Sequence, residues 1–180
     1  MKKNLPILLL VVGFLFVVLA VVVAVMGPKL NSAQVVPIPA AGLADVGDAA
    51  PKTLAGFPMS SSQVGAAALD SIQQLHDANI PLVSGVLAVY GAKSATLWVA
   101  ETGSDAEALK LVQSMEDKIA QGGSGFTTKG VFQFRKRDVY MMETATTSEF
   151  FMQSGKKVLW VSILPEQAEQ AMKEMLDFYP

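Results

Sequence analysis

The sequence predicts a single N-terminal transmembrane helix followed by an α+β domain. In this domain a mostly antiparallel sheet of about six strands is backed by two or three helices. Three observations predict the architecture: an uncharged apolar run near the N-terminus, short strand-like segments joined by tight turns, and amphipathic helices that follow strands and carry capping signals.

The apolar run covers residues 5–26 and follows Lys2 and Lys3. As a helix it would extend about 33 Å, enough to cross a hydrocarbon core of about 30 Å. A cleaved signal peptide has a shorter apolar core of about 7–15 residues, so the length favours a retained signal anchor. Positive flanks stay cytoplasmic, which places residues 1–4 inside the cell. We therefore expect a single-pass protein of the cell inner (cytoplasmic) membrane, with its C-terminal domain periplasmic or extracellular.

One face of this helix carries small side chains. Gly13, Val17, Ala20 and Ala24 share a stripe, and small residues four positions apart let another helix approach closely. The stripe is interpreted as a helix-docking face. Alternatively, it reflects the general abundance of Ala and Gly in membrane helices.

Residues 27–59 are rich in Pro, Ala and Gly and show little periodicity. Their five prolines rule out a continuous helix and favour extended geometry. This segment is predicted to be a linker, either a tether or an extended arm lying along a partner. The globular α+β domain is then expected over residues 60–180.

A first helix is predicted over residues 60–77, with Ser60, Ser61 and Ser62 as N-cap candidates. Its apolar positions at helical spacing are Val64, Ala68, Ile72 and Leu75. His76, the single histidine, would lie at its C-terminus, where an imidazole interacts with the helix dipole. A zinc site there would have to depend on carboxylates.

Two strands, 86–90 and 95–101, are predicted to form a hairpin. Ser104 and Glu107 then form a capping box that begins a helix ending near residue 121. The following loop, 122–125, is rich in glycine but lacks the Gly-Lys-Ser/Thr of a phosphate-binding loop, so no nucleotide is expected.

Four further strands are predicted near residues 129–135, 139–144, 149–153 and 158–164, and a last helix begins at Pro165. The tripeptide Leu97-Trp98-Val99 recurs as Leu159-Trp160-Val161 at the same place before a helix. The sequence therefore suggests two pseudo-symmetric β-β-α halves.

Large apolar side chains occur on both faces of the later strands. Together with a basic turn they form a candidate partner surface: Phe132, Phe134, Met141, Phe151, Arg135, Lys136 and Arg137. Two alternatives remain open: the first helix covers the second face, and the basic turn is a solvated hairpin tip. If the turn faces a membrane or a partner, it would meet anionic headgroups or an acidic surface.

Composition excludes several function classes. Residues 31–180 carry eleven Lys and Arg and sixteen Asp and Glu, a net charge of −5, which does not favour nucleic acid. The absence of cysteine excludes thiolate chemistry and Cys-ligated metals. A carboxylate pair could be drawn from Glu101, Glu143 and Glu149, but surface charge is the default interpretation of these residues, and no metal or cofactor signature occurs. The chain is not expected to be an enzyme or to hold a cofactor.

These observations lead to a non-catalytic accessory or structural subunit of a larger integral membrane complex, such as those of respiration or photosynthesis. Its helix would dock within the lipid bilayer, and its domain would pack on the periplasmic face of the complex. The alternative hypothesis is a free-standing, membrane-anchored periplasmic domain for ligand binding or sensing.

Overall fold

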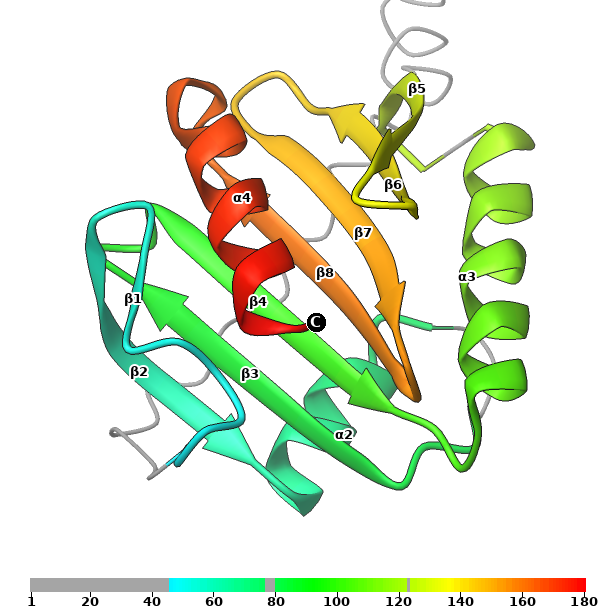
Figure 1. The fold of residues 1–180 in the computed structure, drawn as a ribbon, viewed down its shortest axis with the longest axis horizontal. Helices are drawn as coiled ribbons and strands as arrows, with labels where there is room; N and C mark the ends of the chain where they lie inside the picture. Colours follow the sequence, from blue (N-terminus) through cyan, green and yellow to red (C-terminus); the bar gives the residue numbers. More distant parts are fainter. Residues whose placement is uncertain (1–45, 77–79, 123) are drawn as a thin grey trace, which may run out of the picture. The chain divides into compact units, whose positions relative to one another are not determined.

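The computed structural model describes residues 46–76, 80–122 and 124–180, and these form an α+β domain (Figure 1). No helix within these ranges has the length and apolarity needed to cross a membrane. The predicted transmembrane segment 5–26, with its docking face at Gly13, Val17, Ala20 and Ala24, lies outside the described residues, as do residues 27–45 of the predicted linker.

A single eight-stranded sheet forms the centre of the domain, in the order β1-β2-β3-β4-β8-β7-β6-β5. Every neighbouring pair is antiparallel. The strands are β1 (Thr53–Leu54), β2 (Phe57–Val64), β3 (Ser84–Tyr90), β4 (Ala95–Glu101), β5 (Thr127–Phe134), β6 (Arg137–Glu143), β7 (Ser148–Ser154) and β8 (Lys157–Ile163). The predicted α+β class and the antiparallel sheet are therefore confirmed, with two strands more than expected.

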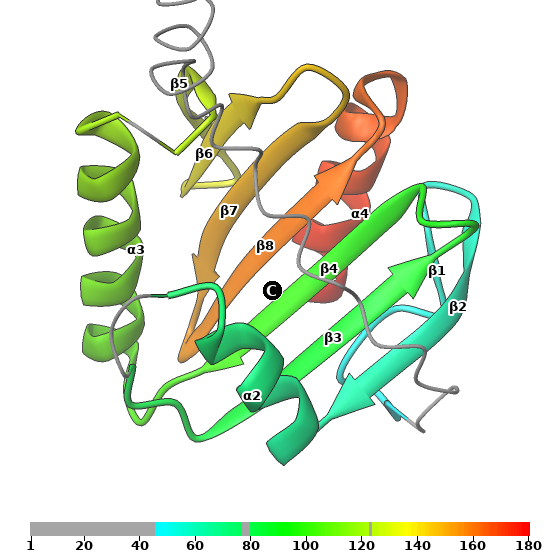
Figure 2. The same cartoon turned by 180° about the vertical axis from the view of Figure 1, so that it is seen from behind.

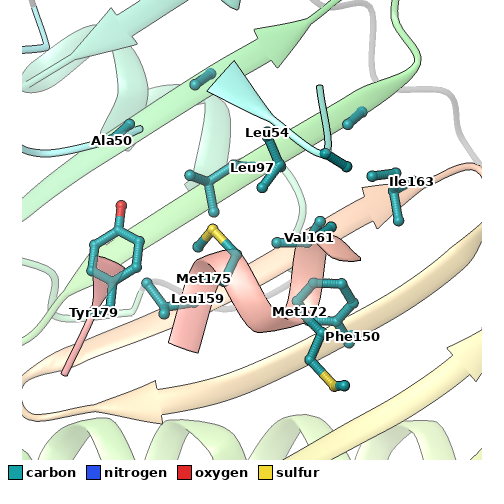
Figure 3. Packing of buried hydrophobic residues seen from close by; sticks show 14 of the residues in the cluster. Ala50, Leu54, Leu97, Phe150, Leu159, Val161, Ile163, Met172, Met175 and Tyr179 are labelled. Atoms are coloured by element: carbon teal, nitrogen blue, oxygen red, sulfur yellow. The ribbon is translucent and has the colours of Figure 1, made fainter. Parts of the chain in front are cut away.

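Helix α4 (Ala168–Phe178), preceded by a short 3-10 turn at Pro165–Gln167, covers one face of the sheet (Figure 1). Its Met172 and Met175 are buried against Leu97, Leu159 and other central-strand residues (Figure 3). The segment 46–55 completes this core, and Leu54 is fully buried there. Removing this much apolar surface from water is the main stabilising contribution to the domain.

The opposite face is covered by α2 (Ala66–Gln73) and α3 (Asp105–Ala120) (Figure 2). Val112 of α3 packs with Phe151, Val158 and the half-buried Trp160. Because successive strand residues point to opposite faces, neighbours such as Phe150 and Phe151 belong to different cores. This explains why the later strands carry large apolar residues at consecutive positions.

The predicted pseudo-symmetry holds for the strands but not for the helices. Trp98 and Trp160 are directly opposite in the β4–β8 pair, at the centre of the sheet. A two-fold axis at that point, normal to the sheet, would place the helices after β4 and β8 on the same face. They lie on opposite faces instead, α3 in one core and α4 in the other. Complete β-β-α halves are therefore not repeated.

Two boundary predictions are wrong. Residues 60–64 belong to β2, and the helix covers only Ala66–Gln73, because the backbone of Ser61 to Val64 pairs with β3. Serine is a weak helix former that is easily accommodated in an extended strand. The predicted linker also extends too far, since Ala50, Leu54 and Ala55 are buried in the α4-side core.

The predicted start of the helix after Ser104 is confirmed. Ser104 caps α3 by accepting a hydrogen bond of 3.2 Å from the backbone N–H of Glu107.

The N-terminal strap, residues 46–55, is held by two tyrosines from distant elements. The Tyr90 hydroxyl donates to the Pro51 carbonyl at 2.9 Å, and the Tyr179 hydroxyl donates to the Ala49 carbonyl at 2.5 Å.

Candidate functional site

The most exposed strand of the domain is β5, which ends the sheet on one side. Its only strand partner among the described residues is β6. Val131 is 47% exposed and Phe132 is 43% exposed. Phe132 pairs with Val139, which belongs to the α4-side core, whereas Val131 pairs with Tyr140 on the α3 side. Apolar surface is thus exposed on both faces of one edge strand.

The turn after β5 has an unusual backbone. Arg135 and Lys136, which form the two-residue loop between Phe134 and Arg137, have φ angles of 50° and 64°. Two-residue hairpin loops favour positive φ because of strand twist, and usually place Asn or Gly there. A non-glycine residue in this region costs about 1–2 kcal/mol. The strained turn therefore presents long cationic side chains where glycine would be easier.

The basic turn is attached to the C-terminal end of α4. Arg137 donates from Nη2 to the Leu176 carbonyl at 2.6 Å and from Nη1 to the Tyr179 carbonyl. Arg135 forms an exposed ion pair with Asp177. Within the described ranges, the Lys136 ammonium has no hydrogen bond or ion pair. One cation of the turn therefore remains available to a partner while the other two fix the hairpin.

The structure brings together most, but not all, of the predicted surface. Phe134 and Met141 are half-buried against the α4-side core, next to the exposed Phe132. The prediction for Phe151 is wrong: this residue is not part of the surface, because it is 1% exposed and faces the opposite core. There it stacks between Tyr140 and Trp160, with ring centroids 4.6 and 5.4 Å away.

We call Val131, Phe132 and the turn 135–137 the β5 edge.

One of the three candidate carboxylates is buried. Glu149 is 5% exposed and accepts hydrogen bonds of 2.7 Å from the hydroxyls of Thr147 and Ser162 and from the indole N–H of Trp160. Burial raises the pKa of Glu149 above its ordinary value, and the three neutral donors partly oppose this shift. The group is held as part of a polar network inside the sheet–α3 layer.

The other two carboxylates lie elsewhere and do not form a pair with Glu149. Glu143 makes an exposed ion pair of 2.7 Å with Lys129. Glu101 lines a surface groove of about 330 Å³ together with Asp48, Lys156 and Lys157. Lys157 also lies 5.5 Å from the ring centroid of Tyr179. The groove thus carries charges of both signs.

The histidine is engaged within its own helix. His76 Nδ1 lies 2.9 Å from the Ile72 carbonyl, one turn earlier in the chain. Across the part of the chain that the structure describes, no three His, Asp or Glu side chains are grouped so that they could hold a metal ion.

Sequence reasoning placed the basic turn and its neighbouring apolar residues but missed Val131 and the position of β5 at the end of the sheet. Strand order depends on long-range pairing, which a local pattern does not encode. A weak signal was present: Val131 and Phe132 are consecutive apolar residues in a strand otherwise rich in polar residues and glycine.

Comparison with known proteins gives no family. No protein-family model and no curated protein matches the chain. Among solved structures, the extracellular domain of PknH from Mycobacterium tuberculosis aligns with 67% of this chain and 78% of its own, at 14% sequence identity and a TM-score of 0.39. A likeness at this level carries no conclusion about function.

Proposed function

We propose that the protein is a non-catalytic, membrane-anchored accessory subunit of a larger integral membrane complex, and that its domain binds a protein partner through the β5 edge. The N-terminal helix would hold the domain at the periplasmic surface. The proposal combines the anchor expected from residues 5–26 with the surface found in the described domain.

The observation that carries the proposal is the exposure of Val131 and Phe132 beside a strained basic turn. Elsewhere in the described sheet, α4 covers a large apolar core on one face and α3 covers a smaller one on the other. Exposed apolar side chains with polar groups at their rim are typical of protein–protein interfaces. The strain of the turn is also of the kind that is retained at functional positions.

A pair of matched substitutions tests this function. Val131→Glu changes the β5 edge, while Leu109→Glu changes an equally exposed apolar residue, 47% for both, on α3. Membranes that contain the full-length protein are extracted in mild detergent, and the species are separated by size. We expect the wild-type protein and the Leu109 variant to migrate in a large complex and the Val131 variant to be released. A wild-type protein that migrates alone would contradict the proposal.

The groove beside Lys157 supports a second candidate function, a ligand-binding or sensing domain. Its volume of about 330 Å³ falls at the lower limit of small-molecule sites. Because Asp48, Glu101, Lys156 and Lys157 line it, a small zwitterion such as an α-amino acid is the fitting ligand class. Thermal unfolding with a panel of amino acids would test this: a rise in Tm that Lys157→Ala and Glu101→Ala abolish favours it, and no rise in Tm excludes it.

A further inference from the structure

The hydrogen-bonding geometry of β5 points to a particular mode of binding. In a two-residue hairpin, the residues that flank the loop form a hydrogen-bonded pair, here Phe134 and Arg137. Along the two antiparallel strands, hydrogen-bonded pairs then alternate with non-hydrogen-bonded pairs. The backbone groups of Phe134 and Phe132 therefore face β6. Those of Val131 and Gln133 face away from β6, toward the open side of the sheet.

The first half of β5 is protected against strand pairing, and the second half is not. Between Thr128 and Gly130 the register shifts, and Lys129 lies within this irregular part. Bulges and edge lysines are devices that prevent association of sheet edges. From Val131 to Phe134 the register is regular and these devices are missing.

The exposure of both Val131 and Phe132 favours an added strand over a partner that packs on one face of the sheet. A partner that packs on one face of the sheet would bury either Val131 or Phe132, because they point to opposite faces. An added strand presents side chains to both faces and would bury both. The anchoring of the hairpin to α4 through Arg137 fixes this edge before binding, which lowers the entropy lost on association.

We infer that residues 131–134 receive an extended segment of a protein partner as a ninth strand. The segment would carry apolar side chains beside Val131 and Phe132 and an acidic residue at the end that meets Lys136. This inference rests on the proposed function and specifies its mode. A second copy of the chain fits less well, because β5 contains Lys129 and no Asp or Glu and so could not supply the carboxylate.

A proline substitution tests the strand-addition mode separately from the surface. Gln133→Pro removes an outward-facing N–H and should break no hydrogen bond to β6; proline is tolerated on the open side of edge strands. Gln133→Ala is the matched control, since it also loses the side-chain hydrogen bond to Asp138 but retains the N–H. Equal urea midpoints for the two purified full-length variants would show that both fold. If the Pro variant does not fold, Val131→Pro replaces it, with Val131→Ala as its control.

Each protein is extracted from membranes in mild detergent and sized. We expect wild type and Gln133→Ala to retain a heterologous partner and Gln133→Pro to lose about tenfold in retained partner, corresponding to about 1.4 kcal/mol. Retention by the Pro variant equal to the Ala control would overturn strand addition and leave the accessory function standing. A large species that contains only this chain would overturn the inferred partner in favour of a second copy. A wild-type protein that runs alone would overturn the proposed function itself.

Discussion

Arg137, the first residue of β6, donates a hydrogen bond of 2.6 Å from its Nη2 atom to the carbonyl oxygen of Leu176 near the end of α4. Carbonyls in the last turn of a helix have no partner within the helix, and a guanidinium satisfies them well. The contact joins residues 39 positions apart. It therefore fixes the β5–β6 hairpin, whose outer strand is the proposed binding edge, to the core helix.

Replacing Arg137 with alanine is expected to destabilise the domain by about 1.5–3 kcal/mol, because two hydrogen bonds from a charged donor are lost at the end of α4. Urea unfolding measures the change. Lys129→Ala is the control, since its exposed ion pair with Glu143 contributes at most about 1 kcal/mol. Equal losses for both variants would show that Arg137 does not anchor the hairpin.

Lys136→Gly should stabilise the isolated protein and weaken its complex. Glycine adopts the positive φ of 64° without strain, which gains about 1–2 kcal/mol, and part of this is offset by the flexibility of glycine in the unfolded chain. Lys93→Gly, at a φ of 69° in the β3–β4 turn, is the matched control. We expect both variants to unfold at higher urea concentration, and only the Lys136 variant to release the partner. Release by both variants would remove Lys136 from the interface.

Tyr90→Phe and Tyr179→Phe should each loosen the N-terminal strap. Each removes one hydrogen bond to a strap carbonyl, which contributes about 1 kcal/mol. Cleavage by a protease within residues 46–52 should accelerate in both variants. Tyr140→Phe serves as the control, because the Tyr140 ring stacks on Phe151 in the opposite core. Unchanged cleavage in the first two variants would mean that apolar packing alone holds the strap.

Alkaline pH provides a second measurement on the same two tyrosines. Burial raises the pKa of Tyr90 and the pKa of Tyr179 well above the ordinary value. A group whose pKa is raised by folding loses its stabilising contribution as pH increases, so the free energy of unfolding should fall above about pH 10. The double Phe variant should show a smaller fall. An equal fall in both proteins would assign the alkaline transition to other groups.

Glu149→Gln should make the stability of the domain less dependent on pH. Burial raises the pKa of Glu149 in the folded state, so its contribution is fully present below the unfolded-state pKa and is lost as pH rises through the folded-state value. The free energy of unfolding of wild type relative to the Gln variant should therefore decrease as pH rises from 4 toward 7. Urea titrations across this range measure the difference, and a difference independent of pH would show that Glu149 titrates as in the unfolded chain.

Glu149→Ala should show what the buried hydrogen-bond network contributes to stability. The substitution leaves the indole N–H of Trp160 without its acceptor, at a cost of about 1–3 kcal/mol. The Gln variant retains an acceptor for this N–H. The difference between the free energies of unfolding of the two variants, measured in urea, therefore gives the contribution of the network. Equal stabilities would indicate that water replaces the carboxylate.

Local signals in the sequence predicted those elements whose stability is itself local. The helix after Ser104 begins at its N-cap, and the hairpin over residues 84–101 is marked by two apolar runs joined by a tight turn. β1 and most of β2 could not be predicted in this way. Ser61 and Ser62 are extended only because β3 offers them backbone partners, and Leu54 is recruited by a core that forms around α4.

The β5 edge was predictable in part for the same physical reason. The basic turn 135–137 is a local feature and was recognised, whereas the role of Val131 depends on β5 being the last strand of the sheet. Phe151 was misplaced because the sequence did not show that α3 covers its face. The burial of Glu149 likewise depends on Trp160 and Ser162 from the neighbouring strand.

Hydrogen exchange at individual amides, measured on the full-length protein within its extracted complex and after release from it, is the most direct test of binding through the β5 edge. The amides of Phe132 and Phe134, which face β6, should be protected in both states and serve as an internal control. We predict that the amides of Val131 and Gln133 exchange rapidly in the released protein and become protected in the complex. Rapid exchange of these two amides in both states, with the complex intact, would contradict strand addition at this edge.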